Sequence, residues 1–382
     1  MIYLDDCLNV LKNIERNSVD LIYLDPPFFT QKVQKLGKND RLYEFNDVWK
    51  SKDDYLSFMK ERLVLMKGVL KKTGSIFLHC DDSASWYLKI LMDEIFGESN
   101  FRSEIVWTFK RWSNSKKGLL ANHQTIFFYS KSDKYKFNTI YCDYSPTTNL
   151  DQVLQQRERK NGKAVYKTDN NGEVIQANEK KGVPLSDVWD IPFLNPKAKE
   201  RTGYPTQKPI ELLERIIKIC TDENDLVLDP FMGSGTTLVS AKLLNRKYIG
   251  IDRNKDAFDI AQRRLETPFK TKSNLLEKGI DSYKNKSEYE LNILNQFDCV
   301  IVQRNNGIDA FLKRHYKKAP VAIKIQKKSE SFEQSLSLLC KAGNKKKCSY
   351  MVLISNDAKS VAVPDNVIVL STLDCQLDKL LR

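Results

Sequence analysis

An apolar strand expected at residues 19–24 runs directly into the sequence Asp25-Pro26-Pro27-Phe28. Proline fixes its own backbone and pushes the residue before it out of the helical region, so two prolines stiffen this turn. The Asp25 carboxylate and the Pro26 carbonyl then form two fixed hydrogen-bond acceptors beside the flat ring of Phe28. This set suits an amino group on a planar base, because the acceptors orient the nitrogen lone pair and stabilise the positive charge that develops on nitrogen.

A second group of residues that could do chemistry is VLDPFMGSGTT, at residues 227–237. It places Asp229 at a strand end, and Gly233 and Gly235 then permit a tight turn that a ligand can approach closely. No lysine follows the second glycine, so this is not a P-loop, and threonine replaces the third glycine of the dinucleotide fingerprint. Taken alone, a glycine turn or a proline turn with an N-cap aspartate is often structural. Both motifs in one chain favour a functional interpretation.

An acid about twenty residues beyond the glycine turn indicates what it binds. The sequence YIGID ends a second expected strand at Asp252, where an acidic side chain can hold the hydroxyl groups of a cofactor ribose. A nucleoside cofactor without a phosphate to be cradled fits best, and S-adenosylmethionine is such a cofactor. Asp25 should open on the same edge of the sheet, because the carboxyl ends of parallel strands meet there. A base inside a duplex would have to flip out to reach this edge and stack on Phe28.

The elements that must position these motifs follow from the hydrophobic periodicity. Apolar residues at helical spacing predict a helix over 53–71, and a strand is expected at 75–80. Residues 206–254 are expected to form a helix, a strand, the glycine turn, a helix and a strand. This alternation predicts a doubly wound α/β fold with a mostly parallel sheet. A polar loop is expected at 30–47 and an irregular insertion or small subdomain at 143–203.

Composition narrows the class of protein. The 382 residues carry 62 Lys and Arg against 49 Asp and Glu, a net charge of +13, and residues 270–382 alone hold 20 against 12. A basic surplus suits a polyanionic partner, most simply nucleic acid, although lysines also merely solvate surfaces. The eight scattered cysteines and three histidines predict no metal site and a reducing, cytoplasmic location. No apolar run reaches the length of a membrane span, and the acidic N-terminus predicts no secretory signal.

The pair LDPPF and LDPFMGSGTT resembles the amino-methylating DNA methyltransferases, N6-adenine or N4-cytosine, of the permuted β class. The sequences GYPTQKP (203–209), HQTIFFYSKS (123–132) and YLDDCLNVLKNI (3–14) support the resemblance, which covers about residues 1–267. It implies a Rossmann-like catalytic domain that uses S-adenosylmethionine to methylate double-stranded DNA. The implied layout is a catalytic half (1–110), the end of that half with the target-recognition region (111–200), a cofactor-binding half (201–268) and a basic C-terminal α/β domain (269–382).

Site residues are carried over from the family by position, with no metal among the ligands. The residues implied to be catalytic or base-binding are Asp25, Pro26, Pro27 and Phe28. The residues implied to bind the cofactor are Asp6, Thr206, Lys208, Asp229, Pro230, Phe231, Gly233, Gly235, Thr236 and Asp252. Sequence readout is implied for the irregular segment, where seven side chains could contact phosphates or bases or only solvate the surface: Arg111, Trp112, Lys116, Lys117, Arg157, Arg159 and Lys160.

The resemblance favours adenine, because the Asp-Pro-Pro-Phe form is commoner among adenine methylases, with N4 of cytosine as the alternative. No cysteine follows a proline, so the covalent route of cytosine-C5 enzymes is absent. An RNA or protein-amine methylase is disfavoured by the permuted motif order. A catalytically inactive DNA-binding subunit of a modification complex is disfavoured by the intact Asp25 and Asp252. A homodimer and a companion restriction endonuclease are compatible with the family.

The C-terminal segment at 305–339 faintly resembles the restriction-endonuclease-like fold. Asp309 precedes an expected strand that reads Ala322-Ile323-Lys324, so the second oxygen ligand that a Mg²⁺ site needs is missing. An active nuclease is therefore disfavoured. A degenerate module that adds DNA affinity and an unrelated accessory or dimerisation domain both remain open.

Overall fold

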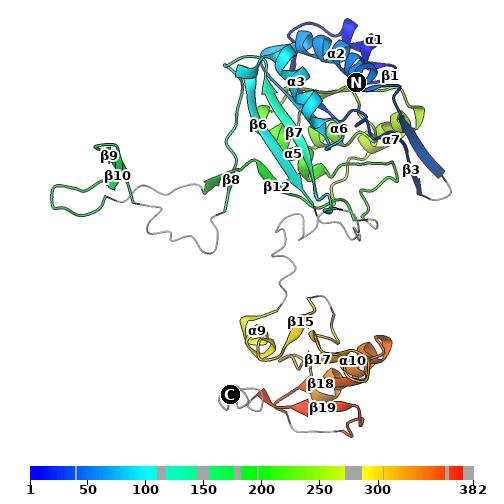
Figure 1. Ribbon diagram of the computed structural model, residues 1–382, viewed down its shortest axis with the longest axis vertical. Helices are drawn as coiled ribbons and strands as arrows, with labels where there is room; N and C mark the ends of the chain where they lie inside the picture. The colour runs from blue at the N-terminus through cyan, green and yellow to red at the C-terminus, as the bar shows by residue number, and fades with distance from the viewer. Residues whose placement is uncertain are drawn as a thin grey trace. The chain divides into compact units, whose positions relative to one another are not determined.

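The chain folds into two compact units, an N-terminal unit of residues 1–272 and a C-terminal unit of residues 273–382 (Figure 1). The computed structural model describes residues 1–38, 41–109, 118–143, 155–175, 182–195, 198–271, 286–303, 305–357 and 361–372. Within these ranges no helix is long and apolar enough to cross a membrane. Four of the expected recognition residues, namely Arg111, Trp112, Lys116 and Lys117, lie outside the described residues.

An eight-stranded sheet forms the centre of the N-terminal unit, in the order β1-β14-β13-β2-β5-β7-β6-β12. Only β7 runs antiparallel to its two neighbours, and every other pair is parallel. This arrangement confirms the predicted mostly parallel α/β sheet. The strands are β1 (Ile2–Leu4), β2 (Val19–Leu24), β5 (Leu70–Cys80), β6 (Phe101–Thr108), β7 (His123–Ser130), β12 (Val188–Asp190), β13 (Leu226–Asp229) and β14 (Lys247–Asp252).

Helices cover both faces of this sheet. The helices α1, α2 and α3 pack on one face, and α5, α6 and α7 pack on the other. The first group is α1 (Cys7–Asn13), α2 (Lys52–Val69) and α3 (Ser85–Phe96), followed by a short 3₁₀ turn at Glu98–Asn100. The second group is α5 (Ile210–Cys220), α6 (Thr236–Leu243) and α7 (Lys255–Glu266).

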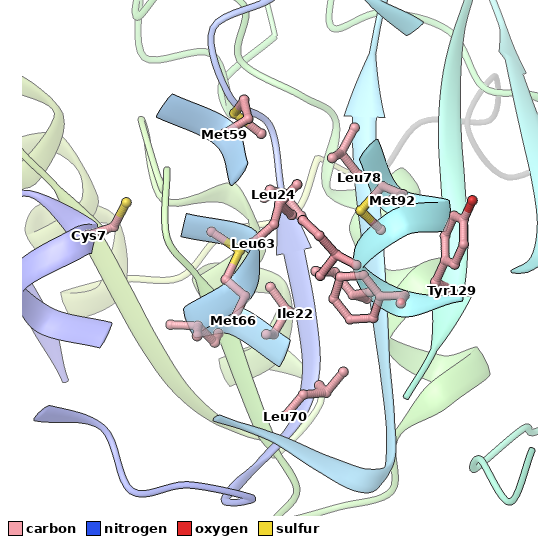
Figure 2. Close-up of a cluster of buried hydrophobic side chains, with 14 of the residues drawn as sticks. Cys7, Ile22, Leu24, Met59, Leu63, Met66, Leu70, Leu78, Met92 and Tyr129 are labelled. Carbon is pink, nitrogen blue, oxygen red and sulfur yellow. The ribbon is translucent and has the colours of Figure 1, made fainter. Parts of the chain in front are cut away.

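Strand β2 is buried on both faces and ends directly before the sequence Asp25-Pro26-Pro27-Phe28. Leu21 and Tyr23 pack toward α5, whereas Ile22 and Leu24 belong to the cluster that α2 and α3 cover, shown in Figure 2. Successive side chains of a strand point to opposite faces, so a strand between two helical layers must be apolar at every such position. The result is a rigid support that ends immediately before Asp25.

The strand register brings the three sequence motifs together. Strand β13 lies between β2 and β14, with Leu228 opposite Ile22 and Asp229 opposite Gly250. All three strands are parallel, so their carboxyl ends open at one edge of the sheet. This edge is the switch point at which ligands bind to doubly wound sheets.

The prediction of a polar loop at 30–47 is wrong. These residues form an antiparallel hairpin of β3 (Lys32–Lys38) and β4 (Arg41–Asp47) in which Lys32 lies opposite Asp47. The hairpin packs on the rest of the unit through only a few aromatic side chains, such as Phe45. Its sequence therefore gives a weaker strand signal than that of a core strand. In the described part of the insertion expected at 143–203, β9 (Arg157–Lys160) pairs with β10 (Lys163–Tyr166), and β11 (Val183–Pro184) pairs with β8 (Tyr141–Cys142), which lies just before it. The insertion also supplies β12 to the central sheet.

The C-terminal unit is a second, smaller α/β structure around a five-stranded sheet. Helix α9 (Glu288–Leu294) covers one face and α10 (Phe332–Lys345) the other. Strand β17 pairs antiparallel with β16 and parallel with β18. The strands in spatial order are β15 (Cys299–Ile301), β16 (Ala310–Leu312), β17 (Val321–Ile325), β18 (Tyr350–Ile354) and β19 (Val367–Leu370).

Buried ion pairs occupy the position of the expected nuclease motif. The Asp309 carboxylate bonds to the ammonium group of Lys286 and accepts a 2.7 Å hydrogen bond from the Ile325 amide. The fully buried Lys324 pairs with Glu330 at 2.8 Å. Among the described residues no three potential metal-ligating side chains gather. The restriction-endonuclease resemblance stays a prediction, and both acids are neutralised by lysines.

Gly250 tests the close packing of β14 against α6. A Cβ atom there would lie 2.3 Å from Leu238 Cδ1 and 2.7 Å from Met232 Sδ. We expect Gly250→Ala to lower the free energy of unfolding by about 1–3 kcal/mol, as overpacking does. Gly68→Ala in α2 is the control, because its Cβ would come no closer than 3.9 Å to another atom and alanine favours helices by about 1 kcal/mol. Urea denaturation measures both, and equal stabilities of the two variants would contradict the packing argument.

Candidate active site

A cavity of about 500 Å³ lies at the carboxyl edge of β2, β13 and β14, beside the β3–β4 hairpin. It has the size of a small-molecule site. The residues predicted from sequence that line it are Asp6, Asp25, Pro26, Pro27, Phe28, Thr206, Lys208, Asp229, Pro230, Phe231, Gly233, Thr236 and Asp252. Gly235 does not line it. Thus the tertiary structure brings together these thirteen residues from five separate segments of the chain.

Asp25 lines the cavity, and its two carboxylate oxygens have different surroundings. Its Oδ2 accepts from the ammonium group of Lys208, whose side chain is almost completely buried. Its Oδ1 is buried and has no hydrogen-bond partner. Burial raises the pKa of the Asp25 carboxyl above its ordinary value, and the Lys208 charge opposes this rise. The nearest ring nitrogen, His79 Nδ1, lies 3.8 Å from Oδ1, and a buried acceptor without a hydrogen-bond partner is costly for the protein.

Lys208 lines the cavity beside the Asp25 turn. Its ammonium group pairs with Asp25 and lies 5.3 Å from the centre of the Phe28 ring, and the cofactor contact that the family position implies stays a prediction. This cation therefore serves the motif expected to hold the base. Its charge opposes the rise in the pKa of the Asp25 carboxyl that burial causes.

His79 lies directly behind the catalytic motif and is neutral. Its Nδ1 bonds with the hydroxyl of Tyr23 at 2.8 Å, and its Nε2 with Gln124 Oε1 at 3.0 Å. Burial holds the pKa of His79 well below its ordinary value, and the charge of Lys208 adds to this effect. With both ring nitrogens engaged, His79 supports the Asp25 side chain from behind, and its Nδ1 lies 3.8 Å from Asp25 Oδ1.

Asp47 holds the backbone of the turn that follows the prolines, and sequence reasoning missed it. Its carboxylate accepts from the amides of Phe28, Phe29 and Thr30 at 3.3, 2.9 and 2.9 Å. It also accepts from the Thr30 hydroxyl at 2.6 Å and the Trp49 indole at 3.1 Å. Phe29 has a φ of 64°, a conformation that non-glycine residues rarely adopt. Five hydrogen bonds to one buried carboxylate thus stabilise an otherwise unfavourable turn.

Asp252 and Asp229 shape the other half of the cavity. Asp252 accepts from the amides of Gly233 at 2.9 Å and Asn254 at 2.8 Å, so its carboxylate closes the glycine turn. Asp229 accepts from the Phe231 amide at 3.0 Å. Burial raises the pKa of Asp229 to about 7, and nearby hydrogen bonds oppose the rise.

The two glycines of the turn have different tasks. Gly233 has a φ of 47°, and a Cβ there would lie 3.3 Å from the Tyr204 ring, which closes the cavity from the other side. Gly235 was expected to let a ligand approach, but its open face meets α7, where a Cβ would lie 2.7 Å from that of Ala261. Arg264 of the same helix donates to the Ser234 carbonyl at 2.7 Å and to Thr236 Oγ1 at 3.0 Å. Helix α7 therefore fixes the turn from behind.

Asp6 and Thr206 lie in the cavity wall. Asp6 caps α1 by accepting from the Leu8 amide at 2.8 Å, and both of its oxygens bond to the buried Arg62 at 2.8 Å. Thr206 is exposed and has a φ of 59°. The sequence analysis placed both near the ends of the cofactor, and that role stays a prediction.

The cavity fits a nucleoside cofactor such as S-adenosylmethionine. Two carboxylates, Asp229 and Asp252, offer acceptors for hydroxyl and ammonium groups, and the glycine turn leaves space that a Cβ at Gly233 would fill. Phe231 and Tyr204 add apolar surface for a ring.

The domain is a doubly wound α/β fold. At one edge of its sheet lie a glycine turn, the acid Asp252 at the end of β14, and the Asp-Pro-Pro-Phe turn. These features are typical of enzymes that transfer a group from a nucleoside cofactor. Comparison with known proteins specifies the family. The model of the N6/N4 methyltransferase family, described as DNA methylase, matches residues 19–263. This chain belongs to that DNA methylase family.

Named relatives agree with this assignment. The Type II methyltransferase M.HpaI of Haemophilus parainfluenzae is 32% identical over 312 residues, 81% of this chain and 85% of that protein. The Type II methyltransferase M.BglII of Bacillus subtilis is 34% identical and covers 69% and 68%. The DNA adenine methyltransferase YhdJ of Escherichia coli K12 is 33% identical and covers 68% and 81%. The solved M1.HpyAVI–SAM complex is 23% identical over 69% of this chain and 98% of its own, with a TM-score of 0.43.

Family membership confirms the predicted resemblance, an enzyme that methylates DNA, and S-adenosylmethionine as the methyl donor. The roles of the individual site residues stay predictions. The largest omission was the β3–β4 hairpin with Asp47, Phe45 and Asn46. The sequence offered one sign of a strand here, because Tyr43, Phe45 and Asp47 alternate with their neighbours ahead of Trp49. The many charged residues around them made the segment resemble a polar loop.

The pH dependence of methyl transfer tests the Asp25–Lys208 pair. Protonation of Asp25 removes an acceptor, so kcat/KM should fall as the pH drops through its raised pKa. Lys208 lowers that pKa, and Lys208→Met should therefore move the acidic limb of the profile to higher pH and reduce the rate at neutral pH.

The matched control is Lys71→Met, which removes the cation paired at 2.8 Å with buried Asp20 at the opposite end of β2. It should leave the limb in place. An acidic limb that is unchanged in Lys208→Met would show that the pair does not govern activity.

Asp47 has a separate test. We expect Asp47→Asn and Asp47→Ala to reduce the single-turnover rate of methyl transfer by about tenfold or more, since hydrogen bonds to a charged group contribute about 1.5–3 kcal/mol each. Binding of S-adenosylmethionine, measured by calorimetry, should remain. Lys35→Ala is the control, because it removes an exposed ion pair of the same hairpin. A wild-type rate, or parallel loss of cofactor binding and folding, would contradict a positioning role.

Proposed function

We propose that this enzyme methylates the exocyclic N6 of an adenine that is flipped out of a short DNA motif. The single observation that carries the proposal is that Asp25, Pro26 and Phe28 line one cavity together with the glycine turn, while Asp25 Oδ1 has no hydrogen-bond partner. One relative, YhdJ, is named a DNA adenine methyltransferase. The Asp-Pro-Pro-Phe form of the motif favours the same base.

When bound, S-adenosylmethionine supplies an electrophilic methyl group. Asp229 and Asp252 would hold the cofactor's polar groups, together with Gly233 and Phe231. At the other half of the site, Asp25 Oδ1 and the Pro26 carbonyl would accept the two N–H bonds of the amino group. The nitrogen lone pair is then directed at the methyl group, and Asp25 Oδ1 holds the proton that nitrogen must lose. Phe28 would stack on the base, and Lys208 keeps Asp25 ionised.

We also propose that the β9–β10 hairpin takes part in target recognition. Arg157, Arg159 and Lys160 are exposed on β9, and the Arg157 guanidinium lies 5.2 Å from the ring centre of Tyr166 on β10. Exposed cations on a two-stranded ribbon suit contacts to phosphates and base edges. A cytoplasmic location, a homodimer and a companion restriction endonuclease stay predictions of the resemblance.

The decisive experiment is modified-base sequencing of genomic DNA from a methylation-free bacterial host that expresses the chain or its Asp25→Ala form. We expect N6-methyladenine within one short motif for the wild type and none for Asp25→Ala, with cofactor binding retained in the purified variant. N4-methylcytosine would keep the mechanism and overturn the choice of base. Marks in both strains would refute the role of Asp25, and marks in neither would favour the alternatives of an inactive subunit or another substrate.

A further inference from the structure

One end of the C-terminal unit gathers basic side chains from two segments that are distant in sequence. Residues 313–319 connect β16 to β17, and residues 346–349 connect α10 to β18. Because β17 and β18 are parallel, both segments lie at the end where these strands begin. Ser349 joins them directly, since its hydroxyl donates to the Tyr316 carbonyl at 2.8 Å and its amide to the Pro320 carbonyl at 3.1 Å.

We call this surface the basic end. Its cations are exposed, and within the described ranges no carboxylate pairs with Arg314, Lys317, Lys318, Lys346 or Lys347. Lys313 alone pairs with an acid, Asp298 at 2.6 Å. Asp365 also lies toward this end, at the start of outer strand β19, but cations clearly outnumber acids here. Unneutralised charges of one sign on a small surface create a potential that attracts a polyanion.

The backbone at the basic end has a defined conformation. Tyr316 and Ala319 exchange two backbone hydrogen bonds of 3.0 Å across a tight turn. Lys317 and Lys318, at its centre, have φ angles of 48° and 60°, a left-handed conformation that costs roughly 1–2 kcal/mol per residue. A surface that only needed solubility would not require lysines at these two strained positions. The turn instead presents adjacent cations in a fixed geometry.

Aromatic side chains accompany these cations. Half-exposed Tyr316 packs edge-on against Tyr350, with ring centres 5.1 Å apart. The Lys317 ammonium lies 5.7 Å from the first ring and 5.9 Å from the second. A tyrosine hydroxyl beside ammonium groups is a common donor set for phosphate oxygens in protein–DNA contacts.

We propose that the basic end binds the phosphate backbone of the DNA that the enzyme methylates. The polyanion of this enzyme class is DNA, and the lysines supply point charges suited to phosphates without reading bases. The contact would add sequence-independent affinity and hold the duplex while the N-terminal unit acts on its base. This inference concerns affinity alone, so it can fail while the proposed adenine specificity holds.

The chain offers a matched control for charge removal. Lys327 and Lys328 are exposed, belong to the same unit, and follow β17 at the opposite end of the sheet. The test variant is Lys317→Gln with Lys318→Gln, and the control is Lys327→Gln with Lys328→Gln. Both remove two positive charges from the full chain, so a change in net charge alone would affect them equally. A second test variant, Lys346→Gln with Lys347→Gln, removes two charges from the other segment.

Equilibrium binding to a short labelled duplex, measured over a salt series, distinguishes the outcomes. Each test variant should bind more weakly than the control, and its slope of log K against log salt should fall by about 1.8, which corresponds to two lost phosphate contacts. Single-turnover methylation at saturating DNA should be unchanged. Test variants that match the control would overturn the proposal, and so would a change in sedimentation behaviour without a change in DNA affinity, which would indicate a self-association surface.

Discussion

The ion pair between Asp25 and Lys208 is the interaction on which the organisation of the site depends. A carboxylate at the end of a fully buried strand would be costly to ionise, and the rise in the Asp25 pKa reflects that cost. Lys208 offsets it from a segment far away in sequence and leaves Oδ1 without a partner. Removing one member of a buried pair is typically destabilising by about 3–5 kcal/mol. The site can therefore remain polar only while both halves of the domain stay together.

Two further carboxylates hold the backbone turns that form the cavity. The Asp47 carboxylate accepts hydrogen bonds from the backbone amides that follow the prolines. The Asp252 carboxylate accepts one from the Gly233 amide of the glycine turn. In both cases the side chain comes from another element, the β3–β4 hairpin or the end of β14. Each turn thus has its shape fixed by tertiary contacts before any ligand arrives, which is the preorganisation that transfer to a weakly nucleophilic amino group requires.

The two units place their charged side chains in physically different ways. In the N-terminal unit the charged groups of Asp25 and Lys208 are buried, form an ion pair and line the cavity. In the C-terminal unit the lysines of the core, Lys286 and Lys324, are neutralised by Asp309 and Glu330, while those at the basic end are exposed. Buried pairs fix geometry, whereas exposed cations provide an attraction that depends on salt.

The sequence alone determined the motifs, their order and the edge of the sheet at which they meet, because these depend on local periodicity and on the rule that parallel strands open together. It therefore predicted Asp25, Asp229 and Asp252 at one cavity. Only the tertiary structure decided what Lys208, Asp47 and Gly235 contact. Lys208 pairs with the Asp25 carboxylate, Asp47 contacts the turn after Pro27 from a hairpin that the sequence analysis missed, and Gly235 faces α7. Such contacts depend on how segments that are distant in sequence pack together. No local sequence pattern encodes the distance or the relative orientation of two such segments.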